Sequence, residues 1–276
     1  MKYANLHLHS NHSDGGFTPQ QLVLLGKSLG YHALALTDHE TDSGTDEMMA
    51  AGRKEGVEII SGAEFYGNVA GRSVHLTALD FDTKNPALRQ FIKDRVDARY
   101  ELTRWSFQRG IDIGCIRGIT WEDVLQANPD NAWLCIDSVL NAYHARKVPV
   151  PEDLREQVFK GPEVQAHTPP SPSAKEVIEV VRGAGGVIAL AHPQNQTDLI
   201  PQLVTYGLNG VEVSHPNIYE NTPRLAAAMA RKYQLYRCGG TDHTGVMSCC
   251  GGINAIPALQ GISKEDFDIL VNRQLD

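Results

Sequence analysis

Seven short apolar runs along the chain each lead to residues whose side chains bind metal ions well. Helix-like stretches separate most of them. Apolar runs of about four to eight residues in this setting are typical of parallel strands buried on both faces. The carboxyl ends of such strands converge at one mouth of a barrel, where barrel enzymes carry their active sites. In chain order the seven runs lead to His7 and His9, Asp38 and His39, Glu64, His75, His192, His215, and Asp242 with His243.

The repetition predicts a catalytic metal centre. A single histidine at a strand end is more often structural, but closing a strand gives no reason to combine imidazoles with acids so regularly. His7 and His9 lie two apart on a strand, so both face the same way. Glu64 can bridge two cations, and His75 and His192 then complete the second. Mixed imidazole and carboxylate ligands suit Mn, Fe or Zn. Two such metals hold a hydroxide and take up phosphoryl charge.

Composition excludes several classes of partner. A net charge of -8 disfavours broad nucleic-acid binding, so no stable nucleic-acid complex is expected. The chain lacks an apolar run of about eighteen residues, so we expect no membrane span. It has no signal-peptide pattern at its start, and its five cysteines form no CxxC pair. We therefore expect reduced thiols in a cytoplasmic protein. The oligomeric state is not indicated.

The alternating pattern is interrupted once. Residues 1–82 and 171–276 have the strand and helix alternation of a barrel, whereas 83–170 have helical spacing and no buried-strand run. We therefore predict an α/β fold, a distorted (β/α)7 TIM-like barrel, with 83–170 inserted as a small helical lid domain that shapes the substrate pocket. Helices are predicted at 19–30, 43–56, 134–143, 151–159 and 174–182.

The order of these motifs resembles the PHP (polymerase and histidinol phosphatase) phosphoesterases, a family of metal-dependent enzymes. The matching segments are His7-Leu8-His9-Ser10, Ser13-Asp14-Gly15, Thr37-Asp38-His39, Gly62-Ala63-Glu64, His75, Ala191-His192-Pro193 and Gly240-Thr241-Asp242. The resemblance implies a seven-stranded barrel with two or three divalent metals. It assigns the first metal to His7, His9, Glu64 and Asp242. It assigns the second metal to Glu64, His75 and His192.

The third metal of the family maps to Asp14, His39 and a histidine two residues after the last Asp. This chain has Thr244 at that position and a histidine one residue earlier, at His243. A shift of one residue on a strand turns a side chain to the opposite face. Either the third site is weak or empty, or His243 reaches it by another route. A freed His243 would instead act as the general acid for the leaving alcohol, beside Glu64 and Asp242 as catalytic residues.

The substrate is less sharply indicated. The resemblance implies an Arg-x-His motif in the lid of nucleotide-hydrolysing members, and the corresponding stretch here lacks that arginine. The cationic candidates that remain in the lid are Arg99, Arg117, Lys160 and His167. His215, at the end of the sixth strand, is a further candidate for substrate contact. A branch of the family that hydrolyses a cyclic phosphodiester of a ribose phosphate would not need the missing motif.

We therefore expect a phosphoesterase that hydrolyses a small phosphomonoester or cyclic phosphodiester, such as a ribose cyclic phosphate, by attack of a metal-bridging hydroxide. The alternative within the family is a nucleoside 3',5'-bisphosphate phosphatase or a short-RNA 5'-end exonuclease. Two alternatives come from other classes. One is an amidohydrolase-like deaminase or lactonase, which would ignore phosphate esters. The other is a non-catalytic PHP module associated with a DNA polymerase, which would bind DNA.

Overall fold

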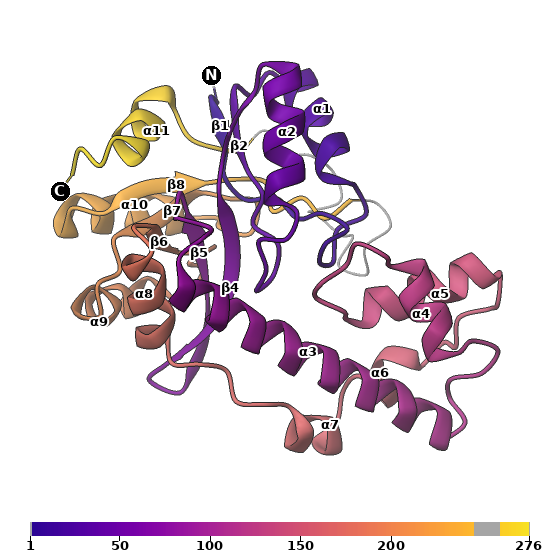
Figure 1. Ribbon diagram of the computed structural model, residues 1–276. Helices are drawn as coiled ribbons and strands as arrows, with labels where there is room; N and C mark the ends of the chain where they lie inside the picture. The colour runs from indigo at the N-terminus through magenta and orange to yellow at the C-terminus, as the bar shows by residue number, and fades with distance from the viewer. Residues whose placement is uncertain (1, 246–259, 276) are drawn as a thin grey trace.

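The computed structural model describes residues 2–245 and 260–275, and its strands form two sheets (Figure 1). A parallel sheet has the order β1-β2-β3, and a mixed sheet has the order β4-β5-β6-β7-β8. The strands are β1 (Ala4–Asn5), β2 (Ala33–Ala35), β3 (Glu58–Ile60), β4 (Gly62–Val69), β5 (Arg72–Leu79), β6 (Val187–Leu190), β7 (Gly210–Ser214) and β8 (Tyr236–Gly239).

Helices occupy the positions expected from the apolar spacing. Thr18 caps α1 and accepts a hydrogen bond from the Gln21 amide, and Gly56 ends α2 in the left-handed conformation that glycine adopts without strain. The helices are α1 (Pro19–Ser28), α2 (Thr45–Glu55), α3 (Pro86–Asp112), α4 (Trp121–Ala127), α5 (Ile136–Arg146), α6 (Leu154–Val158), α7 (Pro162–His167), α8 (Ala174–Gly183), α9 (Ile200–Thr205), α10 (Thr222–Tyr233) and α11 (Lys264–Val271), with a 3-10 turn η1 (Thr197–Leu199).

The predicted α/β class is confirmed, but a closed TIM-like barrel is not. Among the described residues no continuous ladder joins the two sheets. Single bridges do so at two places, Leu8 with His243 and His39 with Glu64. Strand β1 is only two residues long, because its pairing stops where the chain reaches the histidines. The sheets therefore meet edge to edge at the ligand-bearing ends without closing.

A β-hairpin replaces part of the expected parallel pattern. Strand β4 runs antiparallel to β5, and β5 runs antiparallel to β6. The reason is the turn at Ala70 and Gly71, which both have positive φ, at 51° and 74°. A two-residue turn of this kind joins only antiparallel strands. As a result, Glu64 and His75 lie within neighbouring hairpin strands rather than at the ends of parallel ones.

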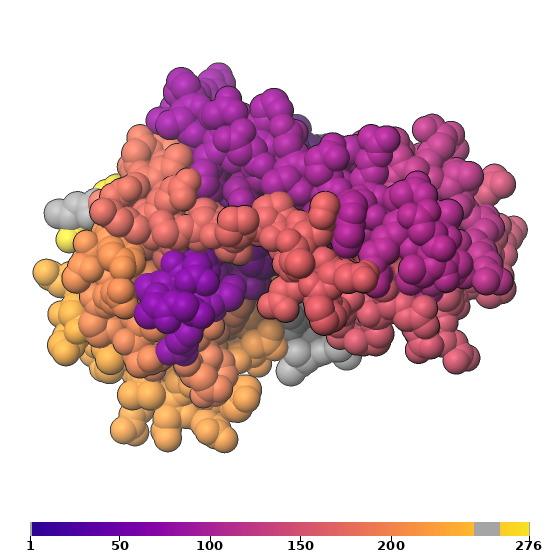
Figure 2. All heavy atoms as spheres, turned by 90° about the horizontal axis from the view of Figure 1, so that it is seen from below, coloured from indigo at the N-terminus to yellow at the C-terminus, as the bar shows by residue number. Residues whose placement is uncertain are grey.

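The segment predicted as the lid contains only helices. Residues 83–170 form α3 to α7, and α3 extends from the sheets to a cluster of α4, α5 and α6 (Figure 1). This cluster has its own apolar core, which includes Phe107, Val139 and Tyr143. In the space-filling view these helices form a lobe beside the rest of the molecule (Figure 2). A separate core supports treating 83–170 as a domain, which remains our interpretation.

Two further sequence expectations concern membranes and thiols. No helix in the described part of the chain is both long enough and apolar enough to cross a membrane. Three of the five cysteines, Cys115, Cys135 and Cys238, are described and are free thiols. The other two, Cys249 and Cys250, lie outside the described residues.

Candidate metal centre

Glu64 is the centre of a cluster of histidines contributed by both sheets. Its side chain is almost fully buried, and its two oxygens face different groups of imidazoles. Oε1 lies 3.0 Å from Nδ1 of His75 and 3.1 Å from Nε2 of His192. The other oxygen, Oε2, lies 3.1 Å from Nδ1 of His39 and 3.5 Å from Nε2 of both His7 and His9.

These side chains form four overlapping groups in which ligand atoms lie within 4.8 Å of one another. The groups are His7, His9 and Glu64; Glu64, His75 and His192; His9, Asp14 and His39; and His7, His215 and Asp242. The structure thus brings together all eight residues expected to bind metal. The first two groups share Glu64, as a bridging carboxylate requires.

The donor set fits divalent cations. The buried Nε2 of His7 has no hydrogen-bond partner, and Nε2 of His9 and Nδ1 of His39 lie near carboxylate oxygens without hydrogen-bond geometry. Buried polar atoms are nearly always paired, so orphaned nitrogens that point into one space indicate a missing ligand. Imidazole nitrogens with carboxylate oxygens are the donors preferred by Mn, Fe and Zn. The residues therefore fit the metals that the sequence predicts.

Charges within the cluster depend strongly on one another. Burial pushes the pKa of Glu64 upward, but His7, His75 and His39 outweigh it and hold that pKa well below the usual range. Burial opposes protonation of His7, yet Glu212, Glu64 and Asp242 raise its pKa well above 6.5. The pKa of His39 is likewise raised, against its burial, by Asp14 and Glu64. Cations would replace these protons, so the metal-free cluster is already arranged for positive charge.

The backbone is unusual where two ligands leave their strands. His192 follows β6 with a φ of 27°, and Asp242 follows β8 with a φ of 50°. Non-glycine residues rarely adopt such angles, and those that do are concentrated at functional sites. The left-handed turn at Asp242 also determines where the next residue lies. The His243 ring is buried and stacks on Phe17 at 5.5 Å.

The third predicted site has two ligands of its own and one that it shares. Nε2 of His39 lies 3.6 Å from Oδ2 of Asp14, and Nδ1 of His9 lies 3.5 Å from Oδ1 of Asp14. Nε2 of His9, however, lies 3.0 Å from Oδ1 of Asp242, on the side of the first group. His243 belongs to none of the four groups, and the Thr244 hydroxyl is buried without a hydrogen-bond partner. The prediction that His243 acts as a general acid stays a prediction.

The supporting roles of two buried carboxylates beside the centre were not predicted from the sequence. Glu212 of β7 is 0% exposed, and its Oε1 lies 2.7 Å from Nδ1 of His7. Asp38 accepts hydrogen bonds from the Ser10 amide at 2.7 Å and the Ser10 hydroxyl at 2.6 Å, and so anchors the loop that presents Asp14. The sequence held one signal for Glu212, which is a charged residue inside an otherwise apolar strand, Val211-Glu212-Val213.

A hollow of about 190 Å³ lies between the lid and the sheets beside this centre. Arg99 of α3 lines it, and its guanidinium carbon lies 4.1 Å from the centre of the Trp133 ring. Trp133 in turn lies 4.8 Å from the ring of His39. Arg95 also lines the hollow, but Glu40 already pairs with it at 2.9 Å. Of the cations predicted to bind substrate, Arg99 is therefore the one that lines this hollow.

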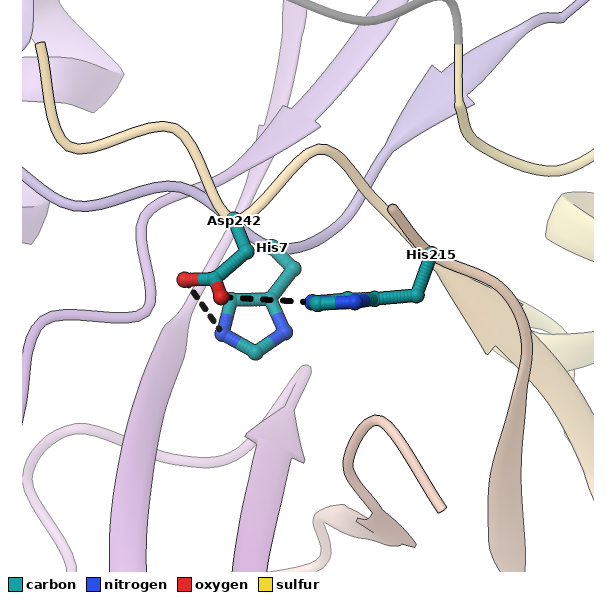
Figure 3. Close-up of side chains that lie close together, drawn as sticks. All are labelled: His7, His215 and Asp242. Carbon is teal, nitrogen blue, oxygen red and sulfur yellow. Dashed lines mark ion pairs between the residues drawn. The ribbon is translucent and has the colours of Figure 1, made fainter. Parts of the chain in front are cut away.

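Arg117, His167 and His215, which were also predicted to contact substrate, are placed differently. Arg117 is exposed, and its Nε donates to the Gly114 carbonyl at 2.7 Å, within its own loop. His167, at the end of α7, stacks on Trp105 at 4.0 Å. Neither lines the hollow beside the centre. His215 does reach the centre, but its Nε2 faces Asp242 at 3.4 Å (Figure 3). The sequence did not reveal these placements, because they depend on tertiary packing.

Comparison with known proteins supports the predicted family. The PHP domain model matches residues 5–93. The matched residues include the predicted metal ligands from His7 to His75. The chain is 28% identical to the phosphoribosyl 1,2-cyclic phosphate 1,2-diphosphodiesterase of Eggerthella lenta, over 87% of its length and 94% of the relative's. It is 29% identical to a 5'-3' exoribonuclease of Haemophilus influenzae, over 87% and 89% respectively.

The fold also matches a solved structure. A protein of Bifidobacterium adolescentis, classed as a metal-dependent phosphoesterase, superimposes with a TM-score of 0.82 and 25% identity. The match covers 99% of this chain and 96% of that protein. It therefore includes the helices of residues 83–170 as well as the residues that carry the metal groups. The resemblance stated from the sequence motifs is confirmed.

Proposed function

We propose that the protein is a metal-dependent phosphoesterase that hydrolyses a small phosphomonoester or cyclic phosphodiester, such as a ribose cyclic phosphate. The observation that carries this proposal is Glu64, whose two oxygens face separate groups of buried imidazoles. Relatives with this domain act on phosphate esters, and the Eggerthella lenta relative is named for a ribosyl cyclic phosphate. The relatives' substrates support phosphoryl chemistry over amide or lactone hydrolysis.

The residues of the chain would divide the work. His7, His9, Glu64 and Asp242 would hold one cation, and Glu64, His75 and His192 would hold a second. Divalent cations bound there would supply an activated water and neutralise phosphoryl charge. Asp14 and His39 would bind a third, weaker cation. Arg99 would bind a phosphate or sugar oxygen on the lid side, which fixes the orientation of the substrate.

The shape of the lid favours a second candidate, an enzyme that acts on a longer phosphorylated substrate such as a short RNA 5' end. The hollow beside Arg99 shares Leu102 and Thr168 with a further hollow of about 240 Å³. Arg155 and Lys160 line the second hollow, although Glu156 pairs with Lys160 at 2.6 Å. A run of cations along connected hollows suits a chain of phosphates.

A substrate screen with metal-stripped protein tests both candidates. Mn²⁺ would be added back, and release of phosphate or ring opening would be measured with phosphomonoesters, ribose cyclic phosphates, nucleoside 3',5'-bisphosphates and short 5'-phosphorylated oligoribonucleotides. We expect the small cyclic and monoester substrates to give the highest kcat/KM. Activity on amides or lactones at saturating Mn²⁺, with none on phosphate esters, would refute the proposal. DNA binding at moderate salt without hydrolysis would favour the polymerase-associated module.

A further inference from the structure

Strand β7 places a buried carboxylate behind one of the candidate ligands. Glu212 uses its first oxygen, Oε1, to contact Nδ1 of His7 at 2.7 Å and to accept a hydrogen bond from the Thr77 hydroxyl at 3.3 Å. Its second oxygen, Oε2, accepts a hydrogen bond from the His192 backbone amide at 2.7 Å. One carboxylate therefore holds two ligands that belong to different metal groups.

The contact with Glu212 determines which nitrogen of His7 is free. A carboxylate only accepts hydrogen bonds, so the nitrogen beside it must carry the proton. In the neutral ring, Nδ1 of His7 therefore carries the proton, and Nε2 keeps its lone pair. Nε2 is the atom that faces Glu64, at 3.5 Å, and Asp242, at 3.6 Å. The hydrogen bond on the far nitrogen thus makes the near nitrogen a ligand.

His215, which directly follows the same strand, has a comparable effect on Asp242. Nδ1 of His215 accepts a hydrogen bond from the Asn217 backbone amide at 3.0 Å, so in the neutral ring the proton lies on Nε2. Nε2 faces Oδ2 of Asp242 at 3.4 Å (Figure 3). The other oxygen, Oδ1, is the one that faces His7 and His9. His215 therefore meets Asp242 as a proton donor rather than as a competing ligand.

We propose that Glu212 and His215 are positioning residues that fix the tautomer of His7 and the orientation of Asp242 for metal binding. The inference rests on the proposed metal centre. It assigns to β7 a supporting role, because neither residue would touch a metal. It also means that His215 is not a metal ligand, although it lies close enough to His7 and Asp242 to form a group of three possible ligands.

The proposal predicts that Glu212→Gln weakens metal binding, although this change keeps the size of the side chain. The amide has one accepting and one donating end, but the His7 ring and the His192 amide both need an acceptor. If the oxygen faces His192, the NH₂ group faces Nδ1 of His7 and drives the proton onto Nε2. If the oxygen faces His7, the NH₂ group opposes the His192 amide. Glu212→Asp keeps the charge but is too short to reach both groups.

The first experiment measures the affinity of each metal-stripped variant for Mn²⁺ by competition with a chelator. Loss of an outer partner of this kind typically weakens metal binding ~10- to 100-fold, and we expect such a loss in both Glu212→Gln and Glu212→Asp. Glu179→Gln, at an exposed position on α8, is the matched control and should behave as the parent. Circular dichroism would verify that each variant is folded.

The second experiment observes the proton directly. Long-range ¹H–¹⁵N correlation spectra of the Zn²⁺-loaded parent should show His7 protonated at Nδ1 and coordinated through Nε2. In Zn²⁺-loaded Glu212→Gln, that pattern should be lost. The variant His215→Phe should bind Mn²⁺ about tenfold more weakly than the parent. The variant His215→Gln should recover part of this affinity, because its amide can donate to Asp242 as Nε2 of His215 does.

Three outcomes would overturn the inference. A folded Glu212→Gln protein with parental Mn²⁺ affinity, or a parent coordinated through Nδ1 of His7, would refute the role of Glu212. A His215→Gln variant no better than His215→Phe would refute the role of His215 as a donor. Failure of the parent to bind Mn²⁺ or Zn²⁺ would refute the metal centre itself, and this result is distinguishable from the other two.

Discussion

Replacing Glu64 with Gln should disable both metal groups at once, since Glu64 is the residue that they share. The amide nitrogen cannot coordinate a cation, and the remaining oxygen loses its negative charge, so both groups are weakened. Loss of an outer partner already costs up to ~100-fold in metal affinity, and a direct ligand should cost at least as much. A factor of 100 is ~2.8 kcal/mol, because each tenfold change is about 1.4 kcal/mol. The two groups together should therefore lose ~5.6 kcal/mol of metal-binding free energy.

The assay combines elemental analysis with turnover. Glu64→Gln protein equilibrated with limiting Mn²⁺ should hold fewer than one ion per chain, and its phosphoesterase activity should fall at least 1,000-fold, about 4 kcal/mol in activation free energy. Glu179→Gln again serves as the control, since the Glu179 side chain is 61% exposed and pairs with Lys175 on the same helix. A Glu64→Gln protein with full metal content and near-parental turnover would show that Glu64 does not bridge the two groups.

The remaining predictions concern other parts of the centre. His192→Ala should abolish activity but leave the circular dichroism spectrum of the protein unchanged; unfolding would mean that the metals are structural. Arg99→Ala should raise KM more than it lowers kcat, whereas Arg117→Ala should match the parent in steady-state kinetics; equal effects would contradict the placement of Arg99 in the hollow. Thr244→His should raise the metal content from about two to three ions per chain, because it adds an imidazole to Asp14 and His39; no change in elemental analysis would remove Thr244 from that site. Finally, the raised pKa values of His7 and His39 stabilise the metal-free fold fully below about pH 6.5, the value for the unfolded chain, and this contribution is lost as pH rises through the raised values. As pH rises from about 6.5 to about 9, the thermal midpoint of metal-free protein should thus fall relative to that of Zn²⁺-loaded protein. If the difference between the two midpoints stays constant over this range, the charge assignment is wrong.

The metal ligands were predictable because they follow apolar runs. A histidine or acid at the end of a buried strand is visible in the sequence, and parallel strands bring such ends together. Glu64 and His75 were found by the same reasoning, although the hairpin places them within antiparallel strands. Both residues were correctly predicted to lie among the metal ligands, but the antiparallel hairpin that places them there was not predicted. Ala70 and Gly71 are a weak turn signal, so the hairpin was missed.

The supporting residues were not predictable in the same way. Glu212 lies inside an apolar strand, and only the folded structure shows that His7, 205 positions away in the chain, meets it. Arg99, Arg117 and His167 all had suitable charge, but helix packing decided that only Arg99 lines the hollow beside the centre. Barrel closure was also beyond the sequence, since it depends on strand tilt and register across distant segments.

The β4–β5 hairpin makes one part of this fold resistant to change during evolution. Tyr66 pairs with His75, and Glu64 pairs with Thr77, so the register of eight residue pairs is set by a two-residue turn. A single inserted residue there would turn His75 away from the face that carries Glu64. Residues 83–170, by contrast, have an apolar core of their own, so this segment can gain or lose residues without moving the ligands. New specificities should therefore arise by rebuilding residues 83–170, while the length of this turn stays constant.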